Sequence, residues 1–189
     1  MRLPLLKIIT ASVLLAWPFL VWFGLAHNGL QWLLPMLAVV LLLRLRQAQD
    51  NAGPMRRVMQ SVALAGLALC LASALLGTHQ LLLYWPVAVN GIMLALFGSS
   101  LFSAMPLVER LARLQYPQLS AQGVRYTLRV TQIWCGFFIL NGTVALITAR
   151  LGDMALWSAW NGMIAYLLMG ALMAGEWLVR RRVMKRETA

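Results

Sequence analysis

The sequence predicts an all-α fold, a bundle of about six transmembrane helices with both termini in the cytoplasm. Hydrophobic residues make up 61% of the 189 residues and charged residues only 11%, whereas a soluble domain carries about 25% charged residues. The apolar residues form long runs that contain almost no charge. Fifteen of the sixteen Lys and Arg residues flank these runs on what would be one side of a membrane. Together these observations exclude a soluble globular domain.

Each of the first three predicted spans is an apolar run bounded by polar or turn-forming residues. The first follows Arg2 and Lys7 and ends at a His-Asn-Gly turn. The second contains Pro35 and is short for a span, so Arg44 and Arg46 are expected to reach the interface and extend it. A loop rich in Asn, Gly and Pro follows. The third run is rich in Ala, Gly and Ser, which permits close helix packing in lipid.

The last three runs are separated by one long polar stretch and one short turn. The fourth begins beside Tyr84 and Trp85, which are typical interfacial anchors. A polar stretch at 103–129 leads into the fifth run, and a turn containing Arg150 precedes the sixth. In order, the predicted spans are 8–26, 30–43, 58–77, 81–102, 130–149 and 155–179, in a single transmembrane helical domain covering 1–189.

The basic residues are sorted by membrane side. Two lie in the N-terminal segment, four in each of the two inner loops and five in the C-terminal tail, while the outer turns hold only Arg150. Because positively charged short loops stay in the cytoplasm, both termini are expected there. The same bias accounts for the net charge of +11, so we expect no nucleic-acid partner.

An Asn-Gly pair occurs in each of the last three predicted spans. By helix rise, Asn90, Asn141 and Asn161 lie about 13, 12 and 9 Å below the outer ends of their helices, and so share one depth. An amide in hydrocarbon needs a partner, and the adjacent Gly lets a neighbouring backbone approach. Two interpretations stay open: the amides bond across helices and lock the bundle, or they line a polar pocket for a ligand.

The inner polar stretch 103–129 carries the main candidate binding surface. Residues 106–114 place leucines on one helical stripe, which predicts a short amphipathic helix at the membrane interface. Arg side chains offer planar donors to a phosphate, either of a lipid or of the phosphopantetheine arm of an acyl carrier. The alternative is plain anchoring against anionic lipid. The candidate residues are Arg110, Arg113, Arg125, Arg129, Glu109 and Tyr126.

Glu176 is the only carboxylate inside a predicted span, and it lies four residues before Arg180. This spacing favours an ion pair, with an acid–base or proton-coupling role as the alternative. Cys70 and Cys135 lie in apolar runs without CxxC spacing or a nearby His, so we expect neither a metal site nor a disulfide. No cofactor is expected. The His-Asp pair usual in acyltransferases is missing, which disfavours an enzyme without excluding one.

The C-terminal half carries a resemblance to a known family. The segments 108–114, 123–127, 134–138 and 141–142 resemble bacterial inner-membrane proteins that are encoded among fatty-acid- or polyketide-like genes, including aryl polyene and xanthomonadin-type pigment clusters. The resemblance covers 84–180 and carries over no catalytic residue. It implies a multi-pass protein of the bacterial inner membrane, near acyl chains that are assembled on carrier proteins at the cytoplasmic face.

Three functions agree with these observations. The first is an accessory component of a lipid or aryl-polyene-like pathway that docks an acyl-carrier partner, a biosynthetic enzyme or a lipid phosphate at the Arg-rich loop. The second is a small lipid or acyl transporter, which predicts a cavity reaching the three Asn residues. The third is a membrane acyl- or glycosyl-type transferase with Glu109 or Glu176 as base, which predicts a pocket where a Glu faces Arg without being neutralised. Membrane lipids are expected partners in each case, and the sequence specifies no oligomeric state.

Overall fold

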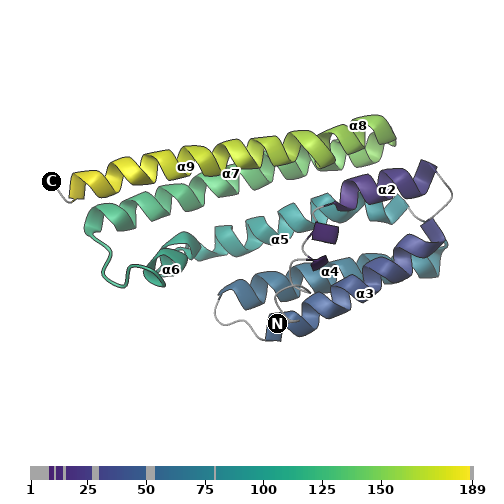
Figure 1. Cartoon of the computed structure of the whole chain (residues 1–189), viewed down its shortest axis with the longest axis horizontal. Helices are drawn as coiled ribbons and strands as arrows, with labels where there is room; N and C mark the ends of the chain where they lie inside the picture. Colours follow the sequence, from purple (N-terminus) through teal and green to yellow (C-terminus); the bar gives the residue numbers. More distant parts are fainter. Residues whose placement is uncertain are drawn as a thin grey trace.

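The computed structural model describes residues 9–10, 12–14, 16–26, 30–49, 54–78 and 80–187. Within these ranges the chain is helical apart from turns and short connections, and no strand is present. The long helices lie side by side with nearly parallel axes (Figure 1). The predicted all-α fold is therefore confirmed.

The helices follow one another with short connections, and the longest connections flank one short helix, α6. They are α2 (Trp17–Ala26), α3 (Leu30–Gln49), α4 (Pro54–Leu76), η1 (Gln80–Tyr84), α5 (Trp85–Ser100), α6 (Leu107–Arg113), α7 (Ala121–Leu151), α8 (Met154–Ser158), η2 (Ala159–Ile164) and α9 (Ala165–Glu187). The η1 segment is a 3₁₀ helix that leads into α5, and η2 is a π-helix between α8 and α9.

Four helical segments of the described chain are long and apolar enough to cross a membrane. They are Arg56–Leu76, Gln80–Ser100, Ala121–Leu151 and Met154–Val183. These segments coincide with the last four predicted spans, and they make this a membrane protein by length and composition. Their large apolar side chains face outward where lipid would lie, as Leu75, Leu167 and Ile139 do. Helix α2 covers only the second half of the predicted span 8–26 and α3 covers the predicted span 30–43, and neither is among these four segments of the described chain.

Several helices extend beyond the predicted apolar runs. Helix α3 continues past residue 43 to Gln49, and α9 continues past residue 179 to Glu187. Both extensions carry Arg residues. Arg is compatible with an α-helix, but its charge ends the part of the helix that can lie in the hydrocarbon of the membrane. Hydropathy therefore predicts which segment lies inside the bilayer, but it does not predict where the helix ends. The connection between α3 and α4 is correspondingly shorter than the predicted loop at 44–57.

Helix α7 begins inside the stretch 103–129 that the sequence assigns to a polar loop. The Ser120 hydroxyl oxygen accepts a hydrogen bond from the backbone N–H of Gly123 at 3.0 Å and caps the helix. Residues 121–129 are consequently the first turns of α7. The short helix predicted in this stretch is present as α6, in which Leu107 is buried together with Glu109, while Leu114 at the end of the predicted leucine stripe is exposed.

Helix α5 lies between α4 and α7 and joins the two halves of the bundle. At one end of the molecule Trp157 of α8 is fully buried, and its indole N–H donates to the Leu83 carbonyl oxygen at 3.0 Å. Gly66 of α4 lies beneath the Trp85 ring, and a Cβ there would collide with that ring and with Leu41. Small residues of α4 thus bring the helices into close contact.

A separate apolar cluster lies at the other end of α5. It consists of buried Phe97, Leu107, Cys135 and Phe138, with Trp134 and Phe137 packed against it. The rings of Phe97 and Phe138 meet edge to face, with their centroids 5.2 Å apart. This cluster holds α6 against α5 and α7 and forms the base of the site described next.

Candidate functional site

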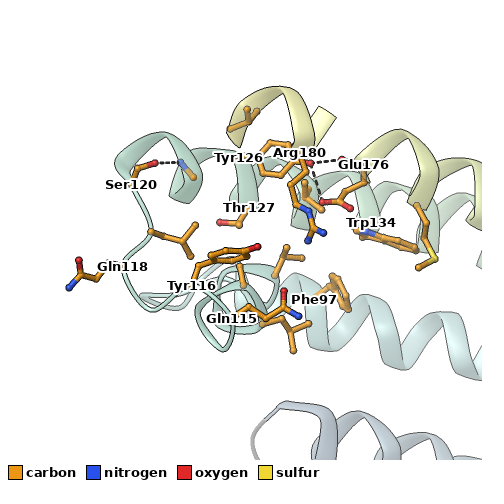
Figure 2. A pocket seen from close by; sticks show the side chains of 18 residues that line it. Phe97, Gln115, Tyr116, Gln118, Ser120, Tyr126, Thr127, Trp134, Glu176 and Arg180 are labelled. Carbon is orange, nitrogen blue, oxygen red and sulfur yellow. Dashed lines mark hydrogen bonds between the residues drawn. The ribbon is translucent and has the colours of Figure 1, made fainter. Parts of the chain in front are cut away.

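A cavity of about 490 Å³ opens between α6, the loop after it, the first turns of α7 and the last turns of α9 (Figure 2). This volume lies in the range of about 300–1,000 Å³ that is common for small-molecule sites. Trp134 and Phe97 lie at one end of the cavity, and Gln118 and Ser120 lie at the opposite end (Figure 2). The site therefore has an apolar end in the bundle and a polar end at the loop.

The carboxylate of Glu176 and the hydroxyl of Tyr126 meet at the wall of the cavity. Tyr126 projects from α7, and its O–H donates to the Glu176 backbone carbonyl at 2.9 Å and to Glu176 Oε1 at 3.1 Å. One hydroxyl proton is shared between these two acceptors. The contact joins α7 and α9 and holds the carboxylate in one orientation.

Arg180 contributes a guanidinium group to the same wall, one helical turn after Glu176. Among the described residues, no side chain or carbonyl oxygen forms a hydrogen bond or an ion pair with the Arg180 guanidinium; the one ion pair in the described part of the chain joins Arg113 to Glu109 in α6. The predicted Glu176–Arg180 ion pair is replaced by the Tyr126–Glu176 hydrogen bond, because Tyr126 packs against that face of α9. The cavity wall thus carries a carboxylate, Glu176, and an exposed guanidinium, Arg180, that form no direct ion pair.

Glu109 and Arg113 stabilise the loop and do not line the cavity. Arg113 Nη2 lies 2.7 Å from Glu109 Oε1, and its Nε donates to the same oxygen at 2.8 Å. Its Nη1 also donates to the carbonyl oxygen of Pro117 at 3.1 Å. The buried carboxylate thus orients an Arg side chain that fixes the start of the α6–α7 loop.

Arg110 has a similar structural role on the other side of α6. Its Nε donates to the Met105 carbonyl oxygen at 2.8 Å, and its Nη2 donates to the Ser103 hydroxyl at 2.7 Å. These bonds close the turn between α5 and α6. Arg110 thus uses two of its five N–H donors to stabilise the loop.

Arg125 and Arg129 lie one turn apart on an exposed face of α7. Neither has a hydrogen bond or ion pair within the part of the chain that the structure describes, and neither lines the cavity. The predicted binding residues are therefore divided among a cavity wall (Tyr126), a loop scaffold (Glu109, Arg110, Arg113) and an open basic face (Arg125, Arg129).

Two of the three Asn residues meet inside the bundle. Asn141 Nδ2 donates to Asn90 Oδ1 at 3.2 Å, and the Trp160 indole N–H donates to Asn141 Oδ1 at 3.1 Å. Gly142 makes room for this contact, since a Cβ there would come within 3.0 Å of the Asn90 Cβ. The amides of Asn90 and Asn141 thus join α5 to α7, and the Trp160 indole joins η2 to them, which agrees with the interpretation that the amides lock the bundle.

Asn161 lies apart from the other two. Its Nδ2 donates to the Trp157 carbonyl oxygen at 2.9 Å and to the Thr148 hydroxyl at 3.3 Å. None of the three Asn residues lines the 490 Å³ cavity, and within the described residues no group of three His, Cys, Asp or Glu side chains is placed to hold a metal ion.

Most cavity residues carry no signal in the sequence by themselves. Phe97, Met173 and Val130 are ordinary apolar residues of their helices, and only the fold brings them together. Tyr126, Glu176 and Arg180 are visible as polar residues at span ends, yet nothing in a single sequence indicates that α7 and α9 bring them to one wall.

No family model, no curated protein and no solved structure matches this chain. The geometry of the cavity is therefore the basis for assigning a function.

Proposed function

We propose that this protein is an accessory component of a bacterial inner membrane that holds an acyl or lipid-like amphiphile for a lipid or aryl-polyene-like pathway. The observation that carries the proposal is the cavity, which combines apolar walls with Arg180 and Glu176 at one side. An apolar chain gains free energy by leaving water for such walls. A polar head group gains specific contacts from the two charged side chains.

The cavity is lined by residues of α6, the α6–α7 loop, the start of α7 and the end of α9. These segments lie together at one end of the bundle (Figure 1). The positive-inside bias assigns this end to the cytoplasm. In this orientation α2 and α3 complete six spans, and both termini are cytoplasmic. The ligand would then enter at the level of the inner leaflet, where a cytoplasmic enzyme delivers or collects an acyl chain.

The exposed face with Arg125 and Arg129 supports a soluble partner at the same end. Two guanidinium groups that no described residue neutralises attract an acidic surface and speed its encounter. An acyl-carrier protein of a biosynthetic pathway is the partner we propose for this face. Arg125→Glu with Arg129→Glu is expected to abolish its co-purification, while Arg150→Glu on the outer turn leaves it intact.

The cavity itself is tested with a photoactivatable fatty acid added to the purified full-length protein in lipid nanodiscs. We expect labelled peptides from the start of α7 and the end of α9. Val130→Phe, which fills the cavity, should remove this labelling, whereas the lipid-facing control Ile147→Phe should not. Labelling spread evenly over all lipid-facing helices would contradict a specific site.

The pathway is tested in a deletion strain by analysing extractable lipids and pigments. Loss or cytoplasmic build-up of one acyl product, restored by the wild-type gene and not by the Val130→Phe variant, is the expected result. An unchanged product profile would contradict a role in such a pathway.

A membrane transferase is the second candidate, because Glu176 faces a cavity with Arg180 and is not neutralised by it. In that case Glu176→Gln abolishes turnover of an acyl or glycosyl donor while leaving binding in place. The transporter alternative has weaker support, because the cavity is not lined by Asn90, Asn141 or Asn161.

A further inference from the structure

We infer that the cavity recognises one kind of head group: an acidic group with a hydrogen-bond donor beside it, at the end of a single apolar chain. The inference rests on the proposed amphiphile-binding function and names its ligand class. It follows from three observations on the cavity, concerning Arg180, Glu176 and the distribution of the apolar walls.

Arg180 supplies the contact for the acidic group. It is the one guanidinium among the cavity residues, and no described side chain or carbonyl pairs with it. Its planar fork matches a carboxylate or a phosphate with two parallel hydrogen bonds.

Glu176 supplies the contact for the hydrogen-bond donor of the ligand. Its Oε1 accepts the Tyr126 hydroxyl at 3.1 Å, and its other carboxylate oxygen has no hydrogen bond from the described residues. A carboxylate only accepts hydrogen bonds. The neighbouring ligand group must therefore donate, as a hydroxyl, an amide or an ammonium does, and a second acid at this point would be repelled.

The spacing of Glu176 and Arg180 limits the distance between the acidic group and the hydrogen-bond donor of the ligand. Glu176 and Arg180 are separated by four residues, which is a rise of about 6 Å along one face of α9. The acid and the donor must therefore lie only a few bonds apart in the ligand. A 3-hydroxy acid and an aminoethyl phosphate both satisfy this condition.

The apolar chain is directed towards the bundle. Trp134 lies about two turns beyond Tyr126 on α7, and Phe97 lies beside Trp134 at the end of the cavity away from Gln118 and Ser120 (Figure 2). Met173, from α9, contributes a flexible apolar side chain to the lining. The head group is thus held at the α9 wall while the chain packs against aromatic rings.

The test measures affinities of the full-length protein in nanodiscs for three probes of equal chain length: a 3-hydroxy fatty acid, the unsubstituted acid and its methyl ester. We expect the hydroxy acid to bind more tightly than the plain acid, and the plain acid more tightly than the ester, by about tenfold at each step. An alkyl phosphate with and without an aminoethyl group repeats the comparison for a phosphate head. A preference in either series supports the inference and identifies the source of the acid.

Two variants separate the contacts. Arg180→Gln should remove the preference for acid over ester, and Glu176→Gln should reduce the preference for the hydroxy acid, each leaving the other preference in place. Arg182→Gln, which is exposed and does not line the cavity, is the matched control. Each preference is a ratio measured on one preparation, so a partly unfolded fraction cancels.

Equal binding of all probes by the wild-type protein would overturn the inference and leave the proposed function standing. The same holds if Arg182→Gln changes the preferences as much as Arg180→Gln does. Absence of binding by every amphiphile would overturn the proposed function as well.

Discussion

The hydroxyl of Tyr126 on α7 lies 3.1 Å from Oε1 of Glu176 on α9, and 2.9 Å from the carbonyl oxygen of the same residue. The two residues are 50 positions apart in the chain. Their contact fixes the last two long helices to each other beside the cavity, and it holds the Glu176 carboxylate at the cavity wall. This position therefore contributes both to the packing of α7 on α9 and to the wall of the cavity.

Replacing Tyr126 with Phe removes the hydrogen bond while retaining the ring. We expect the free energy of unfolding to fall by about 1 kcal/mol, measured by denaturant titration in detergent. Tyr116→Phe is the control, because Tyr116 is exposed and its hydroxyl has no hydrogen bond within the described residues. Equal effects of the two substitutions would contradict a stabilising role of the Tyr126–Glu176 contact.

The pair Glu109 and Arg113 is expected to stabilise the α6–α7 loop. Arg113→Gln leaves a buried carboxylate without its cation, so the free energy of unfolding should fall by about 2 kcal/mol. Protease cleavage in the loop should become faster as well. The exposed control Arg125→Gln should change stability by less than about 0.5 kcal/mol, and a larger effect in Arg125→Gln than in Arg113→Gln would contradict this assignment.

The amides of Asn90 and Asn141 form a direct contact that a double-mutant cycle measures. We expect a coupling free energy of about 0.6 to 2 kcal/mol between Asn90→Ala and Asn141→Ala. Asn161→Ala should show no coupling with Asn90→Ala, since no bond joins these two residues in the structure. If the Asn90–Asn161 cycle gave a coupling free energy as large as the Asn90–Asn141 cycle, the Asn90–Asn141 hydrogen bond would not be the source of the coupling.

Two glycines of α7 provide a matched pair for the packing of α5 on α7. A Cβ at Gly142 would approach the Asn90 Cβ to 3.0 Å, whereas a Cβ at Gly136 meets nothing within 4 Å. Gly142→Ala should lower stability by about 1 kcal/mol, while Gly136→Ala should be neutral or raise it through helix propensity. Thermal unfolding of the two variants measures the difference, and the opposite order would argue against close packing at Gly142.

The orientation of the bundle is tested with reporter tags. Tags at the two termini and in the α6–α7 loop should all be protected from an impermeant thiol reagent in intact cells. A tag in the turn at Gly152 should react, because the positive-inside bias assigns this turn to the outside. Reaction at one terminus with protection at the other would contradict an even number of spans.

The fold class and the last four spans could be predicted because lipid imposes long apolar runs, which are directly visible in a sequence. The helix ends could not, because the Arg residues that end an apolar run also continue a helix, as Arg44 and Arg46 do in α3. The sequence also predicted the α6 helix, whose leucine stripe is local information.

The site was only partly predictable for a related reason. The Glu109–Arg113 pair is a contact between residues four apart in one helix, a local spacing that favours an ion pair. The Tyr126–Glu176 contact and the cavity walls depend on the packing of α5, α7 and α9, which a single sequence does not encode in any local pattern. Arg residues that look equivalent in the sequence consequently have three different surroundings.

The π-helix η2, Ala159–Ile164, determines which way the whole of α9 faces. Its wider turn holds one residue more than an α-helical turn, and each residue corresponds to a rotation of about 100° about the helix axis. With an ordinary α-helical turn in this place, everything after it would be rotated by that angle. Trp157 would stay buried in the core, but Glu176 and Arg180 would no longer face Tyr126. The π-helix at the start of α9 thus determines the direction in which Glu176 and Arg180 point near the other end of that helix.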